Sequence, residues 1–425
     1  MTNIRVEPSP LIMLPFAALL LSIAFAPLIL RHHWERHYHK LCLGLAAITS
    51  SYYIFALRSG TRVLHATLEY ASFMVVVGSF FVVAGGIHLR IRSQGRPALN
   101  TLFLLGGTLL GNIIGTTGAS MLLIRPWIAL NRNRFSGIHT VFFILTVSNI
   151  GGALLPVGPP LFLGYLKGVP FWWALQHCWL PWSVTLAAVL IIFWVLDSLH
   201  FRKRRPPNER ANESVSGGNW HCDGAVNFIF MLALLAALIA APAGWREVIM
   251  VSIATAAFLF TPRQIHRANE FTFAPIKEVA WIFLGIFGTM IPVLDYVETH
   301  AGQLGLRSDL QFYWGTGALS ALLDNAPTYL TFLAGAFGLH GLSMENAAQM
   351  SEFISRHDHH LVAISLGATC FGALTYVGNG PNLLVKAIAE HAKIETPSFF
   401  GYTFKFAVPV LAPIFVLVSI LFFWK

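Results

Sequence analysis

The chain has 425 residues, of which 56% are hydrophobic and only 11% are charged. Soluble domains average about 25% charged residues, so this composition excludes an ordinary soluble protein and indicates a polytopic membrane protein. The formal charge of +9 comes without a basic stripe interleaved with aromatic residues, which argues against a nucleic-acid partner.

Ten apolar stretches are long enough, at about 20 residues, to cross a bilayer as helices. They lie at about 11–30, 41–58, 65–89, 138–165, 172–199, 224–242, 246–261, 276–296, 361–390 and 402–424. Two further apolar stretches, 99–130 and 310–338, are interrupted near their middles by polar and glycine residues, and each predicts two short arms around a tip. The predicted fold class is therefore an all-α polytopic membrane protein.

Basic residues fix the predicted orientation. They gather between the apolar stretches, at 31–40, 90–96, 132–134, 201–210 and 263–267. The positive-inside rule places all five clusters in the cytoplasm, which is consistent only if 99–130 and 310–338 are re-entrant hairpins. The first hairpin then opens to the cytoplasm and the second to the outside, with both termini outside.

The chain divides into two similar halves. A charged, Pro- and Ser-rich segment at 201–223 predicts a cytoplasmic linker between residues 1–200 and 224–425, each with five spans and one hairpin. GTLLGNIIGTTGASMLL (107–123) aligns with GALSALLDNAPTYLTFL (317–333), and GALLPVGPPLF (152–162) aligns with GALTYVGNGPNLL (372–384). Weak internal symmetry with Gly/Pro-interrupted segments at matching places is typical of an inverted-repeat secondary transporter.

Glycines and prolines in two of the spans predict broken helices. GGALLPVGPPLFLGYLKG breaks the span at 138–165, and its counterpart breaks the span at 361–390 near residues 377–382. A broken helix exposes carbonyl groups at the end of one half and N–H groups at the start of the next, which attract cations and anions respectively. Pro159, Pro327 and Pro381 fall where a new half-helix starts, a position that tolerates proline.

Hydroxyl and amide side chains surround these breaks, and their oxygens suit a hard cation such as sodium. The candidate substrate- and ion-binding residues are Asn112, Thr116, Thr117 and Ser120 at the first hairpin, Gly158 at the first break, Ser320, Asp324, Asn325 and Thr328 at the second hairpin, and Asn379 and Asn382 at the second break.

Charged residues within the predicted spans are functional candidates by default. Asp324 lies at a hairpin tip, where it either handles an ion or proton or caps the following arm. Lys386, four residues after Asn382, either pairs with a carboxylate or snorkels toward the cytoplasm. Glu69 lies near one end of its span, where structural pairing is favoured over coupling; Asp197 and Asp295, near helix ends, are predicted to be structural.

Other chemistry receives little support. The histidine clusters at 32–39 and 356–360 lie in predicted surface loops, where interfacial roles are favoured over a zinc site. Four scattered cysteines without CxxC spacing predict neither disulfides nor zinc. The sequence has no GxSxG, Walker or HExxH motif, so neither an enzyme nor an ATP-driven pump is expected. The first ten residues lack the pattern of a signal peptide. No cofactor is predicted beyond a transported or coupling sodium ion and proton.

At these motifs the chain resembles the ion transporter superfamily, in particular NhaD-type sodium/proton antiporters, with arsenite, citrate and divalent-anion transporters as relatives. The resemblance rests on NIIGTTGASMLLIRP (112–126), SNIGGALLPVGPPLFLGYLKGVPFWW (148–173), DNAPTY (324–329) and YVGNGPNLLVKAIAE (376–390), with a weaker match at 68–87. It implies a homodimer in a bacterial inner membrane, with a scaffold, a mobile transport part, and a site built from hairpin tips and broken helices.

One departure leaves two functions open. The family tends to carry an acidic residue in a GDPP motif, whereas here Gly158 is followed directly by Pro159 and Pro160. Sodium/proton exchange needs a titratable carboxylate, and Asp324 is the one central candidate. The first hypothesis is a sodium or lithium/proton antiporter that works by alternating access. The alternative is a sodium- or proton-coupled transporter of an organic anion, such as a dicarboxylate or citrate, or of an oxyanion.

Overall fold

The computed structural model describes residues 8–91, 95–132, 134–204 and 220–424, which form a helical bundle with one two-stranded sheet. The α-helices before residue 205 are α1 (Leu14–Ile29), α2 (Arg31–Ser51), α3 (Gly60–Gly85), α4 (Pro97–Ile114), α5 (Thr116–Leu130), α6 (Gly137–Thr146), α7 (Pro159–Leu166) and α8 (Trp173–Arg204). Those after it are α9 (Val226–Ala240), α10 (Trp245–Phe260), α11 (Arg263–Ala268), α12 (Ala274–His300), α13 (Asp309–Leu322), α14 (Asn325–Leu339), α15 (Ala347–Arg356), α16 (Asp358–Phe371), α17 (Gly380–His391) and α18 (Val408–Phe422).

The outer surface of the bundle is apolar. Six described helical segments are long and apolar enough to cross a membrane: Pro10–Pro27, Gly60–Gly85, Pro97–Ile114, Trp173–Arg202, Ala274–Gln303 and Gly401–Phe422. Large side chains such as Ile191 on α8, Ile229 on α9 and Leu259 on α10 are more than 60% exposed. Water would penalise so much exposed apolar surface, whereas lipid tails accept it. The prediction of an all-α polytopic membrane protein is confirmed.

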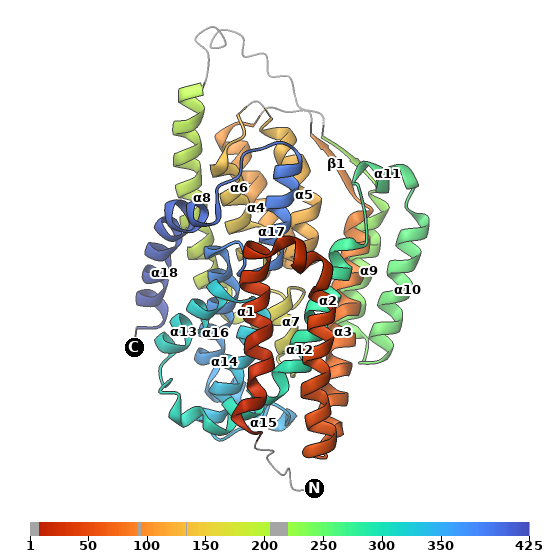
Figure 1. Cartoon of the computed structure of the whole chain (residues 1–425). Coiled ribbons are helices and arrows are strands. Elements are labelled where there is room, and N and C mark those ends of the chain that lie inside the picture. The colour runs from red at the N-terminus through yellow and green to blue at the C-terminus, as the bar shows by residue number, and fades with distance from the viewer. Residues whose placement is uncertain (1–7, 92–94, 133, 205–219, 425) are drawn as a thin grey trace.

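Two helical hairpins enter the molecule from opposite ends (Figure 1). α4 and α5 join at Gly115, whose φ of +79° is a conformation that favours glycine. This hairpin lies at the end where α8 terminates and β1 lies, which we call the linker end. α13 and α14 join at residues 323–324 and lie toward the opposite end. These two hairpins correspond to the interrupted stretches 99–130 and 310–338.

Both predicted broken helices are interrupted in the structure. α6 ends at Thr146, a single 3₁₀ turn follows at Ile150–Gly152, and α7 begins at Pro159. α16 ends at Phe371, another 3₁₀ turn follows at Gly372–Leu374, and α17 begins at Gly380. Proline occupies the first position of α7 and the second of α17, where its missing N–H removes no intrahelical hydrogen bond.

Each hairpin packs against the broken helix of the other half of the chain. α5 packs against α17, and α14 packs against α7. Within each half, α4 contacts the 3₁₀ turn of the first break and α13 packs along α16. The hairpin tips and the helix breaks therefore meet in the middle of the bundle.

A tightly packed layer of α2, α3 and α12 supports this middle region. The rings of Phe73 on α3 and Phe283 on α12 stack with centroids 4.4 Å apart. Glycines bring α12 close to α2, because a Cβ added at Gly285 would lie 3.0 Å from the Cβ of Cys42. Small residues at such contacts allow close helix packing inside a bilayer.

Three features differ from the sequence predictions or lie beyond them. β1 (His88–Ile91) pairs antiparallel with β2 (Trp220–Asp223), a small sheet that the helical patterning does not predict. The histidine cluster at 32–39 lies in a helix and not in a loop, since α2 begins at Arg31. Helical spacing places the rings of His33 and His37 one turn apart, where they stack. Most of the predicted linker 201–223 lies outside the described residues, while its ends belong to α8 and β2.

Candidate functional site

Asn112 fastens the first hairpin to the first helix break. It lies near the end of α4, where its Oδ1 accepts a hydrogen bond from the Leu154 N–H at 2.9 Å and its Nδ2 donates to the Thr108 carbonyl at 3.2 Å. A Cβ added at Gly111 would lie 2.9 Å from the Gly151 carbonyl oxygen, so glycine permits this approach of two backbones. The amide of Asn112 thus pairs an unwound N–H that hydrocarbon would leave unsatisfied.

Amide side chains join the two breaks across the halves of the chain. Asn149 Nδ2 donates to Asn382 Oδ1 at 2.8 Å, and Asn379 Nδ2 donates to the Ser148 carbonyl at 2.8 Å. Ser148 Oγ lies 2.8 Å from Ser120 Oγ on α5, which extends the network to the first hairpin. All five residues are buried. The structure therefore brings the predicted residues Ser120, Asn379 and Asn382 into one polar network.

Thr375 connects the second break to the second hairpin. Its Oγ1 donates to the Ala321 carbonyl at 2.6 Å and accepts from the Gly378 N–H at 3.1 Å. Asn382 Nδ2 donates to the Gly372 and Thr375 carbonyls, each at 3.0 Å. Ser320, on the same hairpin, donates to the Ala368 carbonyl of α16 at 2.7 Å.

Sequence reasoning missed Ser148, Asn149 and Thr375 as members of this network. All three lie inside the quoted motifs SNIGGALLPVGPP and GALTYVGNGPN, next to the residues that were selected. The available signal was their position: each is a polar residue within a few residues of the glycines that break its helix. A buried unwound segment needs such side chains to pair its free backbone groups.

The tip of the second hairpin carries the carboxylate of Asp324. Asp324 is the N-cap of α14, and its Oδ1 accepts from the Ala326 N–H at 3.0 Å, the capping role considered from sequence. Thr328 Oγ1 donates to the Asp324 carbonyl at 2.9 Å. Asn325 is buried, and its Oδ1 has no hydrogen-bond partner among the described residues. This oxygen is one of fourteen buried side-chain atoms that lack a hydrogen-bond partner among the described residues, and it lies beside the carboxylate of Asp324.

Three of the four half-helices that begin at the centre have no side-chain cap. α5 follows Gly115, α7 follows Gly158 and α17 follows Asn379, and none of these N-cap residues accepts a hydrogen bond from its helix through a side chain. Only α14 is capped, by Asp324. Thr116 and Thr117 form the first turn of α5, with Thr116 buried and Thr117 partly buried. All three starts carry the positive end of a helix dipole, which favours anions. Free backbone N–H groups are concentrated at α5, because Pro159 and Pro160 open α7 and Pro381 is the second residue of α17.

Lys386 and Glu69 each pair with an oppositely charged side chain, as considered from sequence, but not with the carboxylate of Asp324. Lys386 pairs with Glu390 one turn further along α17, with Nζ and Oε1 2.5 Å apart, and Lys167 pairs with Glu69 at 2.7 Å. Neither pair includes Asp324. Lys386 and Glu69 therefore satisfy their charges outside the polar network.

Glu69 belongs to a cluster of ion pairs that joins α3, α7 and the segment before α15. Lys167 Nζ also lies 2.9 Å from Glu345, and Arg62 binds both Glu345 and Asp295. Burial raises the pKa of Glu345, but the charges of Lys167 and Arg62 outweigh burial and hold this pKa at about 2. The structural role predicted for Asp295 agrees with this cluster.

Polar clusters also hold the base of each hairpin. At the linker end Arg134 binds Asp197 through two hydrogen bonds of 2.8 and 2.7 Å, and Asn100 of α4 donates to the same carboxylate at 2.9 Å. At the opposite end His360 Nδ1 lies 2.5 Å from Asp309 Oδ1 of α13.

The histidines at 356–360 do not form a metal centre. The rings of His340 and His357 stack with centroids 3.5 Å apart, and burial together with His357 and His360 lowers the pKa of His340 to about 4. No group of three metal-ligating side chains occurs in the part of the chain that the structure describes. Stacked neutral imidazoles at a hairpin base indicate a packing role.

Comparison with known families matches residues 6–423 to a protein-family model described as "Putative citrate transport". This match fits the ion transporter superfamily, and it does not single out the NhaD-type antiporters within it. A comparison with curated proteins gave no match. Nearly the whole described chain, including both hairpins and both breaks, lies inside the matched residues.

Proposed function

Because the chain belongs to the citrate-transport family that it matches over residues 6–423, we propose that it is a secondary transporter of a small carboxylate anion such as citrate. The membrane-spanning helices and the family match together support a transporter that spans the bilayer. The alternative considered from sequence, an organic-anion transporter, has better support than the sodium/proton antiporter.

The uncapped helix starts at the centre carry this proposal. α5, α7 and α17 each begin beside the breaks without a side-chain cap, and each start carries about half a positive charge from its aligned peptide dipoles. Backbone N–H groups bind carboxylate oxygens well, particularly where water is excluded. The hydroxyl groups of Thr116 and Thr117 supply further donors at the start of α5. A carboxylate needs no cationic side chain in such a site.

The second hairpin tip is proposed as the coupling-ion site. Asp324, the unpartnered Oδ1 of Asn325 and Thr328 gather oxygen atoms there, and oxygen ligands suit sodium. Asp324 is also the one carboxylate among the predicted central ligands, so direct sodium/proton exchange has a single titratable group. A cation bound at this tip beside an anion bound at the helix starts gives coupled symport.

Alternating access follows from the interlocked hairpins. Each hairpin packs against the broken helix of the other half, so the two inverted halves proposed from sequence share one site. Movement of α5 relative to α17, or of α14 relative to α7, opens that site to one side at a time. A homodimer in a bacterial inner membrane, with the linker end in the cytoplasm, remains the prediction from the resemblance and the charge placement.

Uptake into proteoliposomes tests the function. Purified protein is reconstituted with an internal pH dye, and radiolabelled citrate is supplied with or without a sodium gradient. We expect citrate accumulation that depends on the sodium or proton gradient, and no dye response to sodium alone. A sodium pulse that moves protons in the absence of any carboxylate would restore the antiporter as the leading function.

A further inference from the structure

A large cavity lies beside the C-terminal turns of α5 and α17 at the linker end. Its volume is about 780 Å³, ample for a tricarboxylate with its water. Apolar walls come from residues such as Ile128 of α5 and Ile388 of α17. The cavity thus lies between α5 from the first half of the chain and α17 from the second. The N-terminal ends of both helices lie near the centre of the bundle.

The charged residues of this cavity are mostly basic. Arg125, Arg132, His391 and Lys393 line it, with Glu270 as its one acidic residue. Glu270 is already paired with Arg125 at 2.8 Å. Arg132 and Lys393 are exposed and form no ion pair among the described residues. Arg125, Arg132, Lys393 and Glu270 together give the cavity lining a formal charge of +2, not counting His391.

Lys393 holds an unfavourable backbone conformation at the mouth of this cavity. It directly follows the C-cap of α17 with a φ of +60°, where helices usually place glycine or asparagine. The Ile394 N–H bonds to the Ala389 carbonyl and the Lys393 N–H to the Glu390 carbonyl, which completes the turn. A lysine costs about 1 kcal/mol here relative to glycine.

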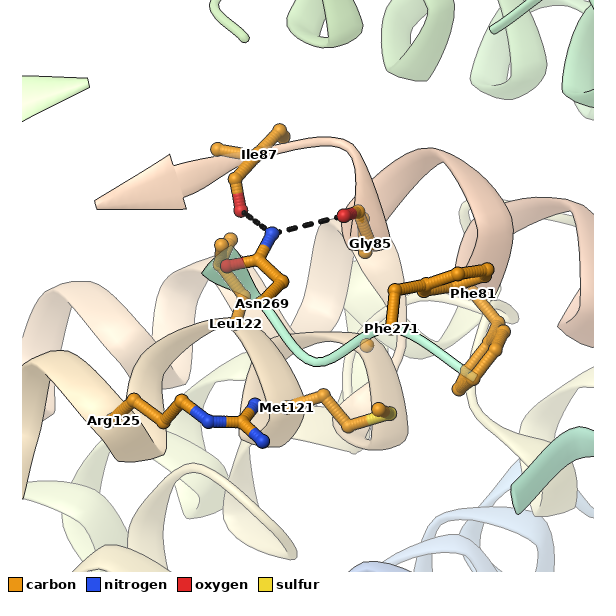
Figure 2. A pocket seen from close by; sticks show the side chains of 10 residues that line it. Phe81, Gly85, Ile87, Met121, Leu122, Arg125, Asn269 and Phe271 are labelled. Carbon is orange, nitrogen blue, oxygen red and sulfur yellow. Dashed lines mark hydrogen bonds between the residues drawn. The ribbon is translucent and has the colours of Figure 1, made fainter. Parts of the chain in front are cut away.

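A much smaller cavity lies on the opposite face of α5. Figure 2 shows Arg125 beside Met121 on α5, below the Asn269 amide that bonds to the Gly85 and Ile87 carbonyls at 2.9 and 2.8 Å. The cavity on this side holds about 20 Å³, room for a single water. Arg125 lines both cavities, and the larger one lies on the α17 side.

We propose that the large cavity is a basic vestibule that collects small multivalent carboxylates at the linker end and passes them toward the helix breaks. The inference rests on the proposed function. α5 runs from Thr116 at the break to Arg125 at the vestibule, about 14 Å along its axis at 1.5 Å per residue. Fixed cations at this distance raise the local concentration of an anion and its rate of encounter, and salt screens that effect over about 8 Å.

The test compares two matched double variants in proteoliposomes, with citrate supplied at the linker end. Arg132→Gln with Lys393→Gly removes the two unpaired cations, and the glycine relieves the left-handed backbone. Arg202→Gln with Arg263→Gln removes two exposed cations of the same end outside the cavity. At low salt we expect a three- to tenfold higher KM and an unchanged kcat for the vestibule variant only. The difference should shrink at 0.5 M salt, and Lys393→Arg should keep the wild-type KM.

Three results overturn the vestibule, two from the paired variants and one from the lipid composition. One is an equal KM shift in both double variants, which reflects general surface charge; another is an unchanged KM in the vestibule variant. A KM shift that vanishes in liposomes of neutral phosphatidylcholine assigns these cations to anionic lipid headgroups and also overturns it. Absence of citrate uptake by the wild type removes the proposed function and the vestibule together, so the two failures are distinguishable.

Discussion

Replacing Asn382 by Ala removes the side chain that ties the two helix breaks together. Asn382 is fully buried, accepts a hydrogen bond from Asn149 and donates to the carbonyls of Gly372 and Thr375. The change leaves both carbonyls without this donor, while Asn149 keeps its bond to Ile144. The second break then loses the Asn382 link to the first, while the bond from Asn379 to the Ser148 carbonyl remains.

The expected loss of stability follows from these contacts. Three buried hydrogen bonds contribute about 1 kcal/mol each, so Asn382→Ala should destabilise the protein by about 3 kcal/mol. Asn382 and Asn149 share one of the three bonds. A double-mutant cycle between Asn382→Ala and Asn149→Ala should therefore give a coupling energy of about 1 kcal/mol.

Asn227→Ala is the matched control. Asn227 is also buried, and its Nδ2 donates to the Gly86 carbonyl at 2.9 Å, the Gly224 carbonyl at 3.3 Å and Thr261 Oγ1 at 2.9 Å, far in the sequence from the hairpins and breaks. Both variants should lower the thermal midpoint in detergent by similar amounts. Only Asn382→Ala should reduce citrate uptake by tenfold or more at a temperature where both remain folded.

The reasoning is refuted if Asn382→Ala transports at the rate of Asn227→Ala, because the amide then stabilises the bundle without shaping a site. A coupling energy near zero would separately contradict the link between the breaks.

Three further changes test other parts of the structure. Asp324→Asn keeps an oxygen and the size of the side chain, so citrate uptake should continue with a weaker dependence on sodium or pH; complete loss of uptake in a folded variant contradicts a purely coupling role. Single cysteines placed in 220–223 and in 341–346 should be labelled from opposite sides of the membrane, and labelling from one side refutes the opposed hairpins. Glu345→Gln should destabilise the protein by about 1 kcal/mol near neutral pH, because its ion pairs lower the carboxyl pKa from 4.5 to about 2 but the residue is exposed to solvent, which screens them. Because this pKa is lowered, the stabilisation exists above pH 4.5 and fades as pH falls toward 2, so wild type and variant should converge in acid thermal scans.

Local chemistry made much of the fold predictable. Clustered proline and glycine favour a helix break, so the interruptions within 138–165 and 361–390 were predictable from sequence, whereas single prolines such as Pro181 of α8 and Pro292 of α12 lie inside continuous helices. The hairpin tip at Asp324 was predictable from another local signal, because aspartate before an apolar helical run is a common N-cap.

Long-range pairing was not predictable in this way. Asn149 and Asn382 are 233 residues apart, and no periodicity connects them. The pairing of β1 with β2 depends on the register of two short strands that themselves carry little β signal. Lys386 was assigned by its helical face alone, yet a nearer carboxylate, Glu390, satisfies its charge.

The interlocking of hairpins and breaks has a consequence for synthesis. When the ribosome has completed the first break, the partner of Asn149 is still 233 residues from being made. At 5–20 residues per second this interval lasts roughly 10 to 50 s. During that time α5 lacks α17 and α7 lacks α14, so polar backbone of the first half waits in the membrane without its final contacts. We therefore expect the translocon or a chaperone to shield the first half until the last quarter of the chain has been inserted.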